Sequence, residues 1–220
     1  MDVGTLLSVS EAADELGVNR QKVLAFIDGG RLPAVRLGNG WWISVSDLTR
    51  FAQVERRPGR PLSATRAWRL LRDAETNGMV HVERGRVNLD GFQLVHLVRR
   101  RAVVHRMHVL DRLVGEVMPL LVAAGEAAAR QHGFAPRSAR QDGDGYLRRS
   151  AFDSLVERFV MVPAVGEEIN VLLRCVDDEV WPFNDGELLV GPLIAAVDMV
   201  GDPIDDRSID AAMPIIERYL

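Results

Sequence analysis

The sequence predicts an α+β protein that begins with a small helical module and continues into a larger mixed region. Three observations lead to this prediction. Residues 6–51 contain two short helices around a tight turn, a hairpin and a third helix. Residues 63–101 repeat the order of a helix followed by an alternating apolar pattern. Residues 102–220 mix strand-like alternation with helical periodicity. A chain of 220 residues has room for about two domains.

The first helix of the module is predicted by its caps. Ser8 and Glu11 have the spacing of a capping box, so a helix should begin there. Gly17 should end it, because glycine takes the left-handed conformation without steric cost. Asn19 should cap a second helix, in which Val23 and Phe26 follow helical spacing. Two short helices around a tight turn are therefore expected.

A hairpin and a third helix should complete the module. The strands are expected at 35–37 and 41–43, joined through Asn39-Gly40, a pair typical of a type I′ turn. Ser44 and Asp47 repeat the cap spacing and open a helix toward Phe51. A helix pair followed by such a wing is typical of a module that reads nucleic acid.

The module resembles the small winged helix-turn-helix domain of the excisionase and MerR-type group. That resemblance covers about 46 of the 220 residues, and its motifs occur here in the same order and spacing. The wing differs, because Trp41 and Trp42 stand where an arginine or lysine is usual, so one tryptophan could belong to the core. The motifs are Glu-Ala-Ala at 11–13, Leu-Gly-Val at 16–18, Gly-Arg-Leu-Pro-Ala at 30–34, Asn-Gly at 39–40 and Asp-Leu-Thr-Arg-Phe at 47–51.

The second helix is expected to enter the major groove of double-stranded DNA with its N-terminal residues. Amide side chains pair with adenine and arginine with guanine, whereas lysine more often supplies charge to a phosphate. A single head covers few base pairs, so we expect a homodimer on an inverted repeat of the protein's own operator, or a second reading unit. The predicted DNA-contacting residues are Asn19, Arg20, Gln21, Lys22, Arg31, Arg36, Asn39 and Trp41.

Charge is distributed unevenly along the chain. Residues 1–110 hold 17 basic and 11 acidic residues, a net charge of +6, whereas residues 111–220 hold 10 and 20, a net charge of −10. A basic half suits phosphate, and the acidic half should be a poor DNA surface. We therefore expect the second half to mediate dimerisation or to bind a partner.

The predicted domain organisation has four parts: a winged helix-turn-helix at 1–55, a basic, proline-rich linker at 56–62, a second winged-helix-like unit at 63–101 and an acidic mixed α/β domain at 102–220. In the last part, Val103–Val109 and 169–176 should be strands, and 134–145, rich in glycine and charge, a mobile loop. Acidic residues near the end, such as Asp202, are expected to be solvated or to face a partner. Helices are expected at 63–75, 92–101, 122–131, 150–159, 192–199 and 209–220, and a hairpin around Arg84-Gly85.

A second, weaker resemblance covers the order of features in the second half. It is similar to the C-terminal region of actinobacterial regulators of the AbiEi antitoxin kind, which are usually partnered with a nucleotidyltransferase-like toxin. This resemblance implies an antitoxin that represses its own operon and opposes a toxin, with the acidic half as the toxin-binding part. The residues that carry it lie at 125–128, 144–147, 170–174, 181–183 and 192–198.

Other functional classes have less support. The chain lacks Walker, Gly-x-Ser-x-Gly and HExxH motifs, so no enzyme, cofactor or metal site is expected. Cys175 is alone and no apolar stretch is long enough to cross a membrane, so a cytoplasmic location is expected. The alternatives left open are a ligand- or partner-responsive MerR- or excisionase-like regulator unconnected to a toxin, a recombination directionality factor, and a protein-binding scaffold.

Overall fold

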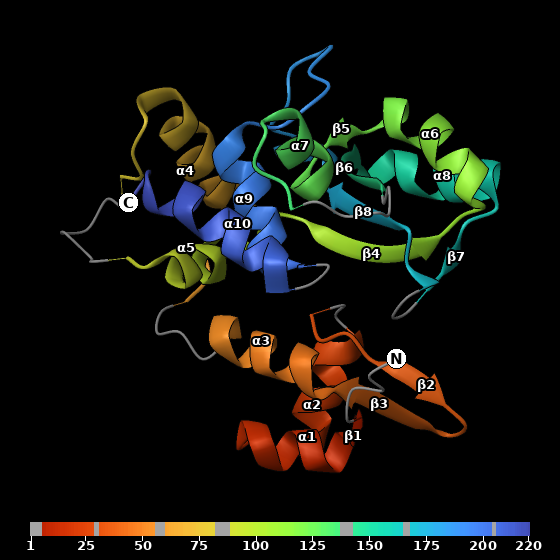
Figure 1. Cartoon of the computed structure of the whole chain (residues 1–220). Helices are drawn as coiled ribbons and strands as arrows, with labels where there is room; N and C mark the ends of the chain where they lie inside the picture. The colour runs from red at the N-terminus through yellow and green to blue at the C-terminus, as the bar shows by residue number, and fades with distance from the viewer. Residues whose placement is uncertain are drawn as a thin grey trace. The chain divides into compact units, whose positions relative to one another are not determined.

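The computed structural model of the chain describes residues 6–28, 31–55, 60–81, 89–136, 143–164, 168–203 and 206–220. The fold is α+β, as the sequence predicts. Contacts between residues divide the chain into two compact units (Figure 1). Unit 1 contains Met1–Arg57 with Val165–Glu168, and unit 2 contains Pro58–Ala164 and Ile169–Leu220.

Unit 1 combines three helices with a three-stranded antiparallel sheet. The sheet has the order β1-β3-β2, so the first strand joins the predicted hairpin, an addition that the sequence patterns did not predict. Leu7 of β1 pairs with Ile43 of β3. In chain order the elements are β1 (Leu6–Ser8), α1 (Val9–Leu16), α2 (Arg20–Asp28), β2 (Val35–Leu37), β3 (Gly40–Ser44) and α3 (Val45–Glu55).

The predicted helix caps of unit 1 are confirmed. The Ser8 Oγ accepts the backbone N–H of Glu11 at 3.3 Å, and a Glu11 carboxylate oxygen accepts the Ser8 N–H at 2.8 Å. Gly17 ends α1 with φ of 63°. The Asn19 Oδ1 accepts the N–H of Lys22 at 2.9 Å at the start of α2. These bonds satisfy backbone groups that a helix end leaves without a partner, so local sequence sets where both helices begin.

The turn of the wing differs from the predicted type I′ turn at Asn39-Gly40. Leu37 pairs with Gly40, so the two turn residues are Gly38 and Asn39. Gly38 has φ of 60°, whereas Asn39 and Gly40 do not have positive φ. A positive φ at the first turn residue alone is the type II′ pattern, which favours glycine at that position. The positive φ that was predicted at Asn39 and Gly40 is therefore found at Gly38 instead.

The core of unit 1 fixes the position of α2. Val23, Phe26 and Ile27 are buried on one side of this helix, and the Phe26 ring lies 4.8 Å from the ring of Phe51 on α3. Burying side chains of this size stabilises a small domain by about 1.5–3 kcal/mol each. The other buried members of this core are Val9, Ala12, Ala13, Leu16, Leu32, Ile43 and Leu48.

Unit 2 is built on a five-stranded mixed sheet of order β5-β6-β8-β4-β7. β6 and β8 are parallel, and the other neighbouring pairs are antiparallel. All six residues of the central strand β8 are buried. The strands are β4 (Val103–His108), β5 (Val122–Ala123), β6 (Gly143–Arg148), β7 (Val162–Pro163) and β8 (Val171–Val176).

Helix α9 is the centre of the helical part of unit 2. Its residues Leu193–Val200 are all buried, and it contacts α4, α5, α7 and α10 (Figure 1). A separate apolar cluster includes Val114 of α6, Leu155 of α8 and Leu173 of β8. The helices are α4 (Ala64–Asn77), α5 (Gly91–Val98), α6 (Asp111–Val117), α7 (Gly125–Gln131), α8 (Phe152–Phe159), α9 (Pro192–Gly201) and α10 (Asp206–Glu217).

The structure groups residues 63–101 with the rest of unit 2 instead of separating them as a second winged unit. Helices α4 and α5 both pack on α9, and the Trp68 side chain of α4 donates to the Arg101 carbonyl at 3.0 Å. The hairpin predicted around Arg84-Gly85 lies outside the described residues, as do the linker residues 56–59. We therefore describe 60–101 as part of unit 2.

Three further predictions about unit 2 are corrected. The helix predicted at 122–131 is preceded by β5 and begins only at Gly125. Residues 143–145, predicted to be loop, belong to the buried strand β6. The Ser150 hydroxyl donates to an Asp178 carboxylate oxygen at 2.7 Å instead of capping a helix, and α8 starts at Phe152.

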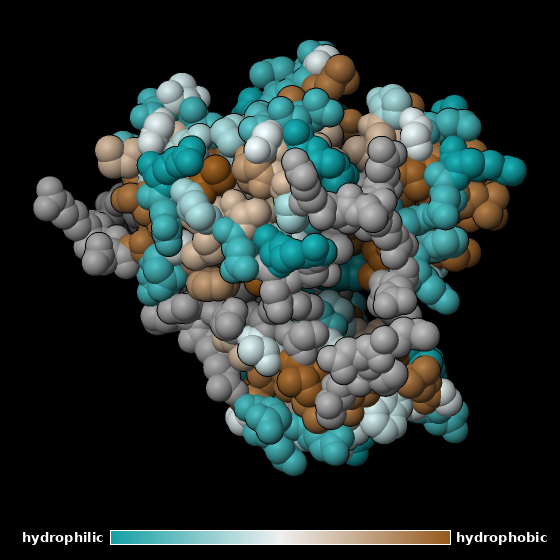
Figure 2. Space-filling model, viewed as in Figure 1, coloured by the Kyte–Doolittle hydropathy of each residue, from teal (hydrophilic) through white to brown (hydrophobic). Residues whose placement is uncertain are grey.

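The visible surface of unit 2 carries scattered apolar side chains between hydrophilic ones (Figure 2). Exposed examples from this unit are Val103, Leu110, Leu120, Val160, Val162 and Leu188. Val160 has φ of 51° and is 81% exposed, an unusual conformation for a β-branched residue.

Candidate nucleic-acid interface

The solvent-facing side of α2 carries three of the predicted DNA-contacting residues. Arg20, Gln21 and Lys22 are all exposed, whereas Val23 beside them is buried. Asn19 is exposed as well, but its Oδ1 is used in the cap of α2. Its amide N–H groups remain the part that can donate to DNA. The N-terminal end of the helix therefore presents amide and cationic groups together.

The ring of Phe26 places two cationic residues on one side of α2. The Lys22 ammonium lies 6.0 Å from the ring centroid, and the Arg31 guanidinium lies 4.6 Å from it. After α2 the chain turns back, because the backbone N–H of Arg31 donates to the Phe26 carbonyl at 2.9 Å. Cation–π contact of this kind orients a guanidinium relative to the ring.

The wing carries a similar pair. Arg36 of β2 and Trp41 of β3 are register partners, and the Arg36 guanidinium lies 5.9 Å from the Trp41 ring. Trp41 also packs against the core of unit 1, so it supports the wing in addition to any contact with DNA. Asn39 is exposed in the turn. Trp41 is thus half-buried and packs against the core without being one of its buried members.

Two exposed residues of α2 were not among the predicted contacts. Ala25 and Asp28 lie further along the same helix, and both are exposed. The predicted contacts on α2 all lie in the first turn of the helix or at its cap. The spacing of Val23, Phe26 and Ile27 could have identified them, because residues opposite a buried stripe face solvent.

Unit 2 holds its charged residues in a different way, in a buried network between the sheet and α9. Arg174 of β8 donates to both carboxylate oxygens of Asp144, at 2.6 and 2.9 Å, and to an Asp202 oxygen at 3.0 Å. Asp198 of α9 accepts from Arg101 and, at 2.6 Å, from the hydroxyl of Tyr146. Arg174 is 1% exposed and Asp198 is fully buried.

Burial and pairing shift the pKa values of this network in opposite directions. Burial raises the pKa of Asp144 to about 6, although Arg174 opposes the shift. Burial alone would also raise the pKa of Asp202, but Arg106 and Arg174 together hold it below its usual value. The carboxyl of Asp202, predicted to be solvated or partner-facing, is in fact 2.6 Å from Arg106. Arg101, Asp144, Arg174 and Asp198 of this network are buried, so their charges are paired inside unit 2.

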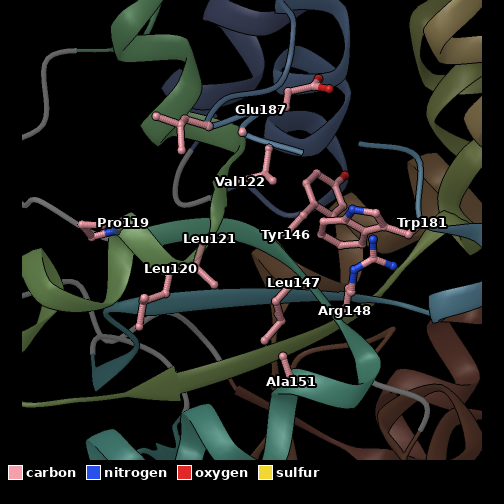
Figure 3. A pocket seen from close by; sticks show the side chains of 12 residues that line it. Pro119, Leu120, Leu121, Val122, Tyr146, Leu147, Arg148, Ala151, Trp181 and Glu187 are labelled. Carbon is pink, nitrogen blue, oxygen red and sulfur yellow. The ribbon is translucent and has the colours of Figure 1, made fainter. Parts of the chain in front are cut away.

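A pocket of about 310 Å³ lies at the end of the sheet of unit 2 (Figure 3). Leu121 and Leu147 form part of its apolar lining, and the Arg148 guanidinium lies 4.8 Å from the Trp181 ring at its side. Glu187, which also lines the pocket, is paired with Arg72 at 2.5 Å. The pocket is an open depression on the surface of unit 2, and its lining is mostly apolar.

Fold and surface together place unit 1 in the class of helix-turn-helix modules with a hairpin wing. Residues 6–54 match the family model of the helix-turn-helix domain, which supports a DNA-binding regulator. Comparison of the chain with curated proteins and with solved structures finds no match. The match lies within unit 1 and does not extend to unit 2.

Membrane-spanning helices and metal-binding clusters are absent from the described residues. No helix among them is long and apolar enough to cross a membrane. Over the same residues, no group of three or more His, Cys, Asp or Glu side chains is placed to hold a metal ion. Cys175 is buried, and burial raises the pKa of its thiol to about 12.

Proposed function

We propose that the protein is a sequence-specific transcriptional regulator that represses its own operon, and that it acts as the antitoxin of a toxin–antitoxin pair. The observation that carries the DNA-binding part is the exposed N-terminal end of α2. Arg20, Gln21 and Lys22 stand together there, with Arg31 beside them on the Phe26 ring. A helix of this kind enters the major groove with its first residues, while flanking cations hold phosphates.

The antitoxin part of the proposal is supported by the motifs of the second half and by its acidity. Unit 2 would bind the toxin or form the homodimer that places two α2 helices on an inverted repeat. We propose a soluble, cytoplasmic protein without catalytic activity of its own. The discriminating observation is genetic: a nucleotidyltransferase-like gene next to this one should be toxic alone and harmless when co-expressed with this chain.

The test of DNA binding is a gel shift on the protein's own upstream region at 50 and 200 mM salt with competitor DNA. Retention should be specific and should weaken steeply with salt, because phosphate contacts release counterions. Arg20→Ala and Lys22→Ala should each reduce affinity about tenfold. Arg112→Ala removes the same charge from an exposed position of α6 and serves as the matched control. Equal affinity of all three variants would refute this placement of the interface.

The pocket of unit 2 favours a second candidate function, a regulator that responds to a small ligand. Its apolar lining and the Arg148 guanidinium beside Trp181 suit a small molecule with an aromatic or apolar body and an anionic group. Quenching of tryptophan fluorescence by such compounds, together with a change in DNA affinity, would support this function. Leu188→Asp, a change at an exposed residue of the pocket lining, should weaken the response to such an anionic compound.

A further inference from the structure

The outward face of α2 is defined by three residues that share one side of the helix. Gln21, Ala25 and Asp28 are four and three residues apart, which places them on one face of a helix with 3.6 residues per turn. All three are exposed, and the opposite face carries the buried Val23 and Phe26. We call Gln21, Ala25 and Asp28 the α2 outer stripe.

Cationic residues lie on both sides of this stripe. Arg20 precedes Gln21 on one side, and Lys22 follows it on the other, where the Phe26 ring also holds Arg31. In a major groove, residues on the two sides of a recognition helix face the two phosphate backbones, and the outermost residues face the base edges. The charges therefore suit phosphates, and the stripe suits bases.

Each member of the stripe has a distinct preference among base edges. A glutamine amide pairs with the N6 and N7 atoms of adenine, and an alanine methyl contacts the methyl of thymine. A carboxylate only accepts hydrogen bonds, so Asp28 suits the N4 amino group of cytosine and repels phosphates. From Gln21 to Asp28 the helix rises about 10 Å, which matches about three base steps.

We propose that Gln21, Ala25 and Asp28 select the DNA sequence, with adenine opposite Gln21, a thymine methyl at Ala25 and cytosine opposite Asp28. This inference rests on the proposed DNA-binding function and deepens it. Arg20 and Lys22 supply affinity for any duplex, whereas the stripe distinguishes one duplex from another. Ala25 and Asp28 are thereby specificity-determining residues.

The first test is selection of bound duplexes from a randomised pool by the full chain. The enriched site should contain the three bases within about three base pairs. Gln21→Ala should reduce affinity for the enriched site about tenfold and lose the preference for adenine. Affinity for unrelated DNA should stay unchanged, because the phosphate contacts of Arg20 and Lys22 remain.

The second test removes the thymine methyl from the DNA instead of changing the protein. Replacing the thymine of the enriched site by uracil should reduce affinity of the unaltered chain about fourfold, the effect of one apolar carbon group. In Ala25→Gly the same replacement should have no effect. Because both duplexes are measured on the same protein, any loss of helix stability in the variant affects both affinities equally.

The third test removes the negative charge of Asp28. Asp28→Asn should raise affinity for unrelated DNA about twofold to fivefold and allow bases other than cytosine at its position. Asp14→Asn makes the same change at an exposed position of α1 and is the matched control, with selected sites unchanged.

The outcomes separate the two levels of the proposal. A chain that retains no DNA at low salt overturns both the proposed function and this inference. Salt-sensitive binding with identical selected sites for the unaltered chain, Gln21→Ala and Asp28→Asn, and without a uracil effect, overturns the inference and leaves the proposed function standing.

Discussion

The two units of this protein use charged side chains in opposite ways. In unit 1 the cations are exposed around α2 and the wing, and two arginines lie on the rings of Phe26 and Trp41. In unit 2, Arg101 and Arg174 are buried with the carboxylates of Asp144 and Asp198. The exposed charges of unit 1 are available to bind a partner, whereas the buried charges of unit 2 are already paired with one another.

Part of the charge asymmetry between the two halves of the chain lies in ion pairs inside unit 2. Arg101 and Arg106 belong by sequence to the basic half, yet they pair with Asp198 and Asp202 of the acidic half. Without these two internal pairs, the +6 and −10 of the two halves become +4 and −8. The asymmetry remains, but part of it is neutralised inside unit 2. Net charges counted from the sequence therefore overstate the charge that is available to a partner.

The largest expected effect is on the stability of unit 2. Arg174→Ala should lower the free energy of unfolding by about 3–5 kcal/mol, because it leaves Asp144 buried without its bidentate partner. Denaturant titration of the full chain measures the loss. Arg112→Ala, an exposed arginine on α6, should change stability by less than about 0.5 kcal/mol. Similar small losses of unfolding free energy in both variants would contradict the distinction between buried, paired charge and exposed charge.

The next effect should appear in DNA binding and not in stability. Arg31→Ala and Arg36→Ala should each weaken binding to the upstream duplex, by about threefold to tenfold, through loss of a phosphate contact. Each should also reduce the slope of log affinity against log salt by about 1. Fluorescence anisotropy over a salt series measures both quantities. Unchanged slopes would remove Arg31 and Arg36 from the interface.

A smaller effect on stability is expected from the helix cap of α1 in unit 1. Ser8→Ala removes the side-chain bond to the Glu11 N–H and should cost about 1 kcal/mol of stability. Ser63→Ala is the matched control, because Ser63 occupies the N-cap of α4 without a side-chain cap bond. Thermal unfolding of the two variants should therefore differ. Equal losses would mean that cap geometry does not explain the stability of α1.

The smallest effect concerns pH and unit 2. Burial, and to a lesser extent Arg149, hold the pKa of His105 below its usual value, with Asp153 partly opposing them. The unfolded chain binds this proton near pH 6.5, and the folded chain does so only at lower pH. Folding stability from this group is therefore lost as pH falls below about 6.5. The Tm difference between pH 7.5 and 5.5 should be smaller in His105→Gln, and an identical difference would contradict this assignment.

Sequence patterns predicted unit 1 well because its signatures are local. The caps at Ser8, Gly17 and Asn19 each depend on residues within three or four positions, and all three form as expected. The wing turn was misplaced by one residue, because Gly38 and Gly40 both flank Asn39 and only strand register distinguishes them. The contribution of β1 to the sheet could not be predicted from three residues.

Prediction was poorer in unit 2, where distant residues decide the structure. Gly143–Gly145 resemble a loop in sequence, yet Asp144 is buried because Arg174, 30 residues later, pairs with it. Gly145 lies so close to Leu121 that a Cβ would be 2.6 Å from its side chain. Asp202 was expected in solvent for the same reason, since its partners Arg106 and Arg174 are far away in sequence.

If unit 1 binds DNA through α2 and the wing, the backbone amides of these elements should be protected on DNA, and hydrogen–deuterium exchange of the full chain measures that protection. The measurement compares the chain alone with the chain on its own upstream duplex at low salt. Exchange should be slower in residues 19–28 and 35–44 on the duplex and unchanged in the buried strand β8. Protection confined to unit 2, with α2 unchanged, would contradict it.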